Sequence, residues 1–130
     1  MGQCLGILVV ERMRQKGIII NRLIVNTTHM VKHIILWTLN PELSEDEKKA
    51  VKAGIKQGLE GLVGKVPGLI DVKVHIDGRL ASSNADVMLD STLESPEALK
   101  GYAVHPEHVA VANGKVRPYT VQRSCLDFEI

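Results

Sequence analysis

The sequence predicts an α+β domain whose elements follow the order β-α-β-β-α-β. Three observations support this order. A strand pattern that is apolar on both faces begins after Met30, and a helix pattern with a clear start signal follows it. Two further strand patterns then lead into a short helix and a last strand. This is the ferredoxin-like split unit, in which a four-stranded sheet carries both helices on one side.

The first predicted strand alternates between two largely apolar faces, since successive side chains of a strand point in opposite directions. One face carries Val31, His33, Ile35, Trp37 and Leu39, and the other carries Ile34 and Leu36. A strand that is apolar on both sides is expected to be buried on both sides. We place His33, Ile35 and Trp37 on the face away from the helices. That open face needs a partner, and a second copy of the sheet in a two-fold dimer is the simplest one.

The long helix has start and stop signals. Ser44-Glu45-Asp46-Glu47 forms a capping box, because the serine oxygen and the glutamate three residues later can each accept from an otherwise unpaired amide. Apolar residues then recur at helical spacing at Val51, Ile55, Leu59, Leu62 and Val66. We expect Pro67-Gly68 to end this helix. Its glycines lack the order of a phosphate-binding loop and indicate close packing instead.

The later elements are shorter. Ile70, Val72, Val74 and Ile76 alternate with polar residues that include His75, which predicts a strand with one solvated face. A third strand is expected over 86–93, and Ser95-Pro96 starts a helix that runs to about Tyr102. A second short helix is expected from Pro106. The last strand spans 119–130, with Leu126, Phe128 and Ile130 on one face.

Composition excludes several classes of protein. The 130 residues correspond to one domain, and no apolar run reaches the roughly 18 residues of a membrane span. The net charge of +1 and an aromatic content of 3% argue against nucleic acid as a partner. Cys4 and Cys125 belong to no motif, which favours a reducing compartment and hence the cytoplasm.

Residues 1–29 differ from the rest of the chain. They hold four basic residues against one acidic residue, and their apolar run precedes the charges, unlike that of a signal peptide. We interpret them as an upstream or vector-derived extension that is dispensable for the core fold, with residues 30–130 as the domain. Alternatively, the Ile18–Ile20 and Leu23–Val25 runs form a small hairpin.

Proton-exchanging residues gather around one proline. Tyr102, His105 and His108 lie within seven positions of one another on either side of Pro106. His108 falls in the first turn of the predicted helix, where the positive end of the helix favours a neutral imidazole that can act as a base. Tyr102 can donate to a developing enolate oxygen. Alternatively, these side chains only satisfy backbone groups at a tight turn.

No metal ion or cofactor is expected. Pro106 prevents His105 and His108 from sharing one helical face, and no set of cysteine or carboxylate ligands accompanies them. No redox or nucleotide cofactor is indicated.

Several segments together carry a family resemblance. They are Met30-Val31-Lys32-His33-Ile34, Val66-Pro67-Gly68, Asp86-Val87-Met88-Leu89, Glu94-Ser95-Pro96-Glu97-Ala98-Leu99 and His105-Pro106-Glu107-His108. Over residues 30–130 the sequence resembles the stress-responsive dimeric α/β barrel family. The resemblance implies a homodimer in which two sheets close a barrel.

One plant branch of that family is a polyketide cyclase, in which a tyrosine and the second histidine of this element carry an aldol-type ring closure. The matching residues here are Tyr102 and His108, and His33 matches a histidine that lines the pocket. Val87 stands where that branch has another pocket histidine.

Two classes of function remain open, so the sequence leaves undecided whether the protein is an enzyme. The first is a dimeric pocket protein with acid–base chemistry on a carbonyl compound, of the lyase, cyclase or isomerase type. Its catalytic residues would be His108 and Tyr102, in a pocket lined by His33, Ile35, Trp37 and His105. The second is a non-catalytic dimeric stress or ligand-binding protein. A closed cavity holding His33, Tyr102 and His108 favours the first class, and a filled sheet interior favours the second.

Overall fold

The structure, a computed structural model, describes residues 29–130. Its strands are β1 (Val31–Leu39), β2 (Leu69–His75), β3 (Val87–Leu93) and β4 (Thr120–Glu129). Its helices are α1 (Glu45–Glu60), α2 (Pro96–Val104) and α3 (Pro106–Val111), and a π-helical turn, η1 (Ala112–Val116), and a 3₁₀ turn, η2 (Arg117–Tyr119), follow α3. The predicted order of elements is confirmed. The interpretation of residues 1–29 concerns a segment that, but for His29, lies outside the described residues, and it stays a prediction.

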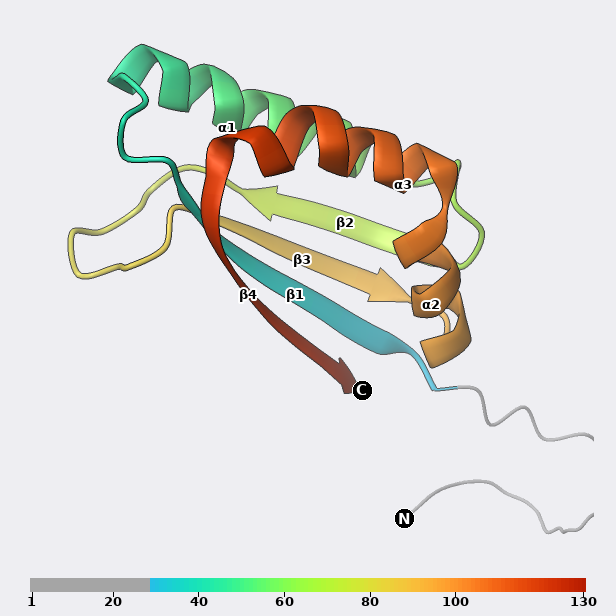
Figure 1. Ribbon diagram of the computed structural model, residues 1–130. Helices are drawn as coiled ribbons and strands as arrows, with labels where there is room; N and C mark the ends of the chain where they lie inside the picture. Colours follow the sequence, from blue (N-terminus) through green and yellow to red (C-terminus); the bar gives the residue numbers. More distant parts are fainter. Residues whose placement is uncertain (1–28) are drawn as a thin grey trace, which may run out of the picture.

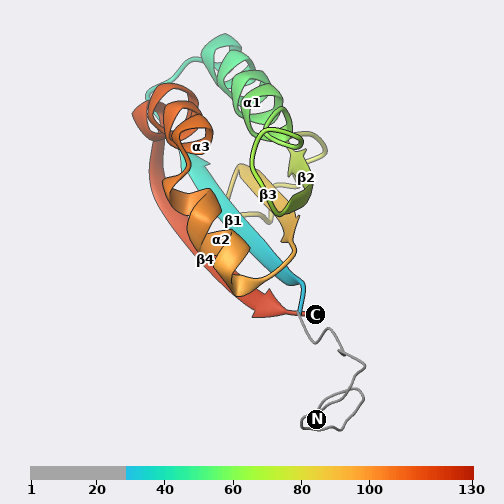
Figure 2. The same ribbon diagram turned by 90° about the vertical axis from the view of Figure 1, so that its right-hand side faces the viewer.

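The four strands form one antiparallel sheet in the order β2-β3-β1-β4. β1 therefore lies in the middle, between β3 and β4. All three helices cover the same face of the sheet (Figures 1 and 2). We call this covered face the inner face and the opposite one the outer face. This is the ferredoxin-like arrangement expected from the sequence.

The placement of His33, Ile35 and Trp37 on the open face is wrong. All three are buried beneath the helices, on the inner face of β1. The reason lies at the two ends of the strand. The inner set begins and ends with apolar residues, Val31 and Leu39, whereas the other set begins and ends with Lys32 and Thr38. Burying the wholly apolar ends and leaving the polar ends to solvent is the arrangement of lower free energy.

α1 begins as predicted. The amide of Glu47 donates to Ser44 Oγ at 3.1 Å, and the amide of Ser44 donates to Glu47 Oε1 at 2.7 Å. The helix ends at Glu60, capped by Gly61, and not at Pro67-Gly68 as expected. Leu62 and Val66 are nevertheless buried, because the turns after the helix hold them against the core. The helical spacing of apolar residues in the sequence therefore continues beyond the end of α1.

A glycine allows α1 and α3 to approach each other closely. A Cβ atom at Gly58 would lie 2.8 Å from Val111 Cγ1, which is closer than side chains tolerate. The expectation of close packing is therefore confirmed at this position. The absence of a side chain at Gly58 leaves room for Val111 of α3 against α1.

β2 departs from strict alternation. A register irregularity lies between Leu69 and Asp71, so Leu69 is buried while Ile70, expected to be buried, is 43% exposed. Beyond this irregularity Val72 and Val74 face the core, and His75 is exposed as predicted.

The outer face has no cover from residues 29–130. Leu36 on β1 and Leu126 and Phe128 on β4 are 40%, 62% and 42% exposed. The register places Lys32 opposite Phe128 and Ile34 opposite Leu126, so these side chains adjoin one another. Over the same residues, no helix is both long enough and apolar enough to cross a membrane.

Candidate functional site

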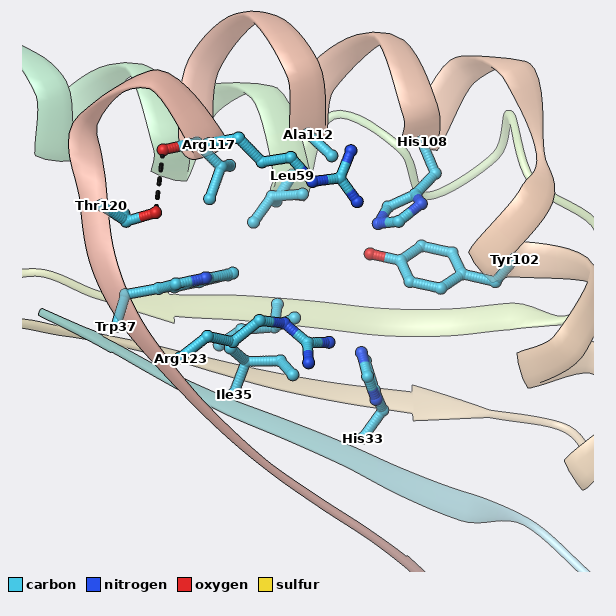
Figure 3. Close-up of a pocket in the computed structure, with 12 residues that line it drawn as sticks. His33, Ile35, Trp37, Leu59, Tyr102, His108, Ala112, Arg117, Thr120 and Arg123 are labelled. Atoms are coloured by element: carbon cyan, nitrogen blue, oxygen red, sulfur yellow. Dashed lines mark hydrogen bonds between the residues drawn. The ribbon is translucent and has the colours of Figure 1, made fainter.

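A cavity of about 360 Å³ lies between the inner face of the sheet and the segment from α2 to η2 (Figure 3). It is lined by His33, Ile35, Trp37, Leu59, Leu89, Tyr102, His108, Ala112, Val116, Arg117, Thr120 and Arg123. The volume falls in the lower part of the range of about 300–1,000 Å³ that is usual for small-molecule sites. Five of the six site residues predicted from the sequence line this cavity. The three on β1 do so although they were expected on the face away from the helices.

Tyr102 supplies a buried hydroxyl group. It lies on α2 with 1% of its surface exposed, and its Oη atom has no hydrogen-bond partner among the described residues. Figure 3 shows the hydroxyl pointing into the cavity. Burial raises the pKa of Tyr102 to about 12, so the phenol keeps its proton at neutral pH. An unpaired buried hydroxyl costs about 1–3 kcal/mol, and a bound acceptor would remove that cost.

The ring of His108 lies beside that of Tyr102, tilted by 39°. The two ring centroids are 4.2 Å apart. His108 Nδ1 lies 3.3 Å from the carbonyl oxygen of Ala103, and because a carbonyl only accepts, Nδ1 carries the proton when the ring is neutral. Nε2 is then the free acceptor.

Burial lowers the pKa of His108, and electrostatic repulsion from Arg117 and Arg123 lowers it further, against an opposing effect of the hydrogen bond to Ala103. The neutral form expected from the sequence is thus favoured, with burial as the main cause rather than the helix end.

His33 reaches the cavity from the sheet. Its ring centroid is 5.9 Å from that of Tyr102, in an edge-on arrangement. Asp127, directly opposite on β4, holds the imidazole through a bond of 2.5 Å from Nδ1 to Oδ1. Since an ionised carboxylate only accepts, Nδ1 of His33 carries a proton, and in the neutral ring Nε2 is a free acceptor.

His105 lies outside the cavity, contrary to the expectation. It ends α2, and its Nδ1 accepts from the amide of Glu107 at 3.1 Å, so the side chain caps the start of α3. The following proline forces extended backbone at His105, with φ −66° and ψ 134°, and this directs the ring back to its own backbone. His105 thus satisfies a backbone group at a tight turn, which is the alternative to a role in the pocket.

Sequence reasoning missed two arginines and an aspartate. Arg123 and Asp127 share the inner face of β4, and Arg117 precedes that strand in η2. A signal was present: Leu126, Phe128 and Ile130 occupy one face of the last strand, so the polar residues between them must share the other.

One group of three potential metal ligands occurs in residues 29–130. His33 Nδ1, Cys125 Sγ and Asp127 Oδ1 lie within 4.8 Å of one another, at the edge of a second, open groove between α2 and β4. The three atoms already interact, since Cys125 lies 3.4 Å from Asp127 and His33 is bonded to the same oxygen. Burial and Asp127 raise the pKa of the Cys125 thiol, which favours the protonated form over the thiolate that binds metals.

The model of the stress responsive A/B barrel domain matches residues 31–130. The chain belongs to this family. The match begins at the first residue of β1 and ends after β4, so it spans the whole fold described above.

Solved structures agree with this assignment. The chain is 30% identical to a dimeric ferredoxin-like protein of unknown function from Bacteroides fragilis, covering 78% of this chain and 96% of the other, with a TM-score of 0.72. A second dimeric ferredoxin-like protein of unknown function, from Thermobifida fusca, is 23% identical over 80% and 93% of the two chains, with a TM-score of 0.66. A hydroxynitrile lyase from Passiflora edulis shares the fold at 17% identity over 78% and 94%, with a TM-score of 0.61. No curated protein matches the sequence.

Proposed function

We propose that this stress responsive A/B barrel protein binds a small carbonyl compound in the inner-face cavity and performs acid–base chemistry on it, of the lyase, cyclase or isomerase type. One observation carries the proposal: the buried hydroxyl of Tyr102 has no partner and lies beside an imidazole whose pKa is lowered. Buried hydroxyl groups in a protein core normally have a hydrogen-bond partner, so an unpaired one needs an explanation. Enolisation of a carbonyl compound needs a base for the proton and a hydrogen-bond donor for the oxygen, and these two side chains can supply both.

The roles follow from the protonation states. Nε2 of His108 accepts the proton from the carbon next to the carbonyl group, and the Tyr102 hydroxyl donates a hydrogen bond to the oxygen on which negative charge develops. His33 is a second imidazole with a free Nε2, held in that tautomer by Asp127. The enolate can then be protonated elsewhere, attack a second carbonyl group or expel a leaving group. These outcomes correspond to the isomerase, cyclase and lyase types.

The solved relatives support the fold and do not define a reaction. The hydroxynitrile lyase from Passiflora edulis has the same fold, but at 17% identity it supports the fold alone. The cyclase resemblance at Tyr102 and His108 is consistent with the same pair of roles. A non-catalytic ligand-binding protein is the alternative, and the experiment below separates the two.

Hydrogen exchange tests the proposal without knowledge of the substrate. Small ketones and aldehydes are incubated with the protein in deuterated buffer, and loss of the proton signal next to the carbonyl group is followed by NMR. We expect acceleration with the wild type, loss of about 100-fold or more with His108→Ala, and a melting temperature close to that of the wild type. A matched control is His75→Ala, which removes an exposed imidazole outside the cavity. Binding without exchange for every compound tried would favour the non-catalytic alternative.

We further propose that the protein is a homodimer joined through the outer face. The exposed Leu36, Leu126 and Phe128 form an apolar surface there, and the relatives from Bacteroides fragilis and Thermobifida fusca are described as dimeric. Leu126→Lys should shift the protein to monomer in sedimentation velocity, because two charges would meet across the two-fold axis. Val104→Lys, an equally drastic change on the helical side, should leave the dimer intact. A wild type that sediments as a monomer at micromolar concentration would exclude this assembly.

The cytoplasm remains the proposed location, because Cys125 is free and no disulfide framework is indicated by the sequence. Cell fractionation tests this. The proposal includes neither a nucleic acid nor a membrane partner, given the net charge of +1.

A further inference from the structure

Two guanidinium groups enter the cavity from opposite sides. Arg123 lies on the inner face of β4, opposite Trp37, and Arg117 lies in η2 above the sheet. Figure 3 shows both side chains reaching inward, one from the strand and one from the helical layer.

Neither arginine has an acidic partner among residues 29–130. The ion pairs of this part of the chain involve other side chains, and the described side-chain partner of Arg117 is the neutral Asn113. Two positive charges that share one cavity repel each other, and they also act on His108. An anion placed between them would remove that repulsion and accept charge-assisted hydrogen bonds from both.

We propose that Arg117 and Arg123 form an anion subsite, and that the compound bound in the cavity is a keto acid whose carboxylate lies between the two guanidinium groups. Guanidinium favours carboxylate through paired, parallel hydrogen bonds. The proposal rests on the proposed function, because it names the substrate class of the same cavity.

The remaining lining fits the other parts of such a molecule. Tyr102, His108 and His33 supply a donor and two acceptors for the carbonyl group and its acidic neighbouring carbon. Ile35, Trp37 and Leu59 supply an apolar wall for a short hydrocarbon chain. A carboxylate also makes chemical sense here, since it would anchor the ligand at a fixed distance from the base.

Calorimetry with a matched pair of ligands tests the subsite. The probes are α-ketocaproate and its methyl ester, which have the same chain and ketone but differ in charge. With the wild-type full chain, we expect the acid to bind at least tenfold more tightly than the ester at low salt. Arg117→Ala and Arg123→Ala should each weaken binding of the acid by about tenfold or more and leave that of the ester nearly unchanged.

Two controls make the test specific. Lys73→Ala removes the same charge from an exposed site on β2, outside the cavity, and should bind the acid as the wild type does. Inorganic phosphate serves as a competitor, and displacement of the acid by millimolar or lower phosphate would show that the pair recognises phosphate instead and would overturn the keto-acid assignment. Both arginines are exposed, so the variants should keep the melting temperature of the wild type.

The subsite is overturned if the acid does not bind, binds no better than its ester, or binds equally to the double variant Arg117→Ala/Arg123→Ala. The failure of the proposed function looks different. Tight, arginine-dependent binding of the acid without exchange of its protons would leave the subsite standing and refute the chemistry. Exchange of neutral ketones with no preference for the acid would support the chemistry and refute the subsite.

Discussion

The two faces of β1 differ in what covers them, although both carry apolar residues at their centre. The inner face lies under the helices and borders a cavity that holds a tyrosine, two histidines and two arginines. The outer face carries Leu36 and Ile34 beside Leu126 and has no cover from residues 29–130. One strand thus supplies a site on one side and an apolar surface on the other.

This difference shows how a small domain can combine a site with a core. The cavity occupies the space where α2, α3 and the turns after them cross the sheet, so the same inner face provides both packing and chemistry. The outer face does not take part in that packing. Substitutions on the two faces should therefore have separable effects.

The largest expected difference is between two leucines of β1. Leu39 is 2% exposed on the inner face, and Leu36 is 40% exposed on the outer face. Leu39→Ala should lower the free energy of unfolding by about 2–5 kcal/mol at every protein concentration. Leu36→Ala should reduce only the part of the stability that depends on concentration, because it weakens association. Chemical denaturation at several protein concentrations measures both, and equal, concentration-independent losses would break the comparison.

A smaller effect of opposite sign is expected at Tyr102. Tyr102→Phe removes the buried hydroxyl that lacks a partner, so it should leave the protein as stable as the wild type or raise the free energy of unfolding by about 1–3 kcal/mol. The same change should abolish hydrogen exchange of bound ketones. A clear loss of stability would show that the hydroxyl is bonded within the protein, which would remove the main support for the proposed function.

The smallest effect is a pH dependence that arises at His108. Its pKa is lowered in the folded state, so between the ordinary value of about 6.5 and the folded value the unfolded chain binds a proton that the folded chain excludes. Stability from this group is complete above about pH 6.5 and is lost as the pH falls toward the folded pKa. His108→Gln should therefore lose less stability than the wild type between about pH 7 and about pH 5. Thermal melts of both proteins across this range provide the measurement, and parallel curves would contradict the assignment.

The sequence predicted the order of elements because their boundaries depend on local chemistry. The Ser44 capping box, the Ser95-Pro96 helix start and the proline after His105 act on their own backbone neighbours, and each lies where it was expected. The family resemblance grouped Tyr102, His108 and His33, but the face of the sheet on which they meet was not the expected one. The choice of face for His33 failed, because it rested on the apolar residues that both faces carry and not on the polar Lys32 and Thr38 at the ends of the outer set.

Other parts of the site depend on contacts between distant residues. The bond from His33 to Asp127 joins residues on different strands, and only the register of β1 with β4 brings them together. The arginines were missed for a related reason. Their roles depend on a cavity whose walls come from α1, the sheet and the segment after α3, and no local pattern encodes that convergence.

The central claim is that the inner-face cavity holds a neutral imidazole base beside a free hydroxyl donor. Nitrogen and carbon NMR of the His108 ring through a pH titration of the full chain tests it most directly. We expect a titration midpoint below the ordinary value of about 6.5, with the proton of the neutral ring on Nδ1 and with Nε2 free. A midpoint at or above about 6.5, or a neutral ring protonated on Nε2, would contradict the account.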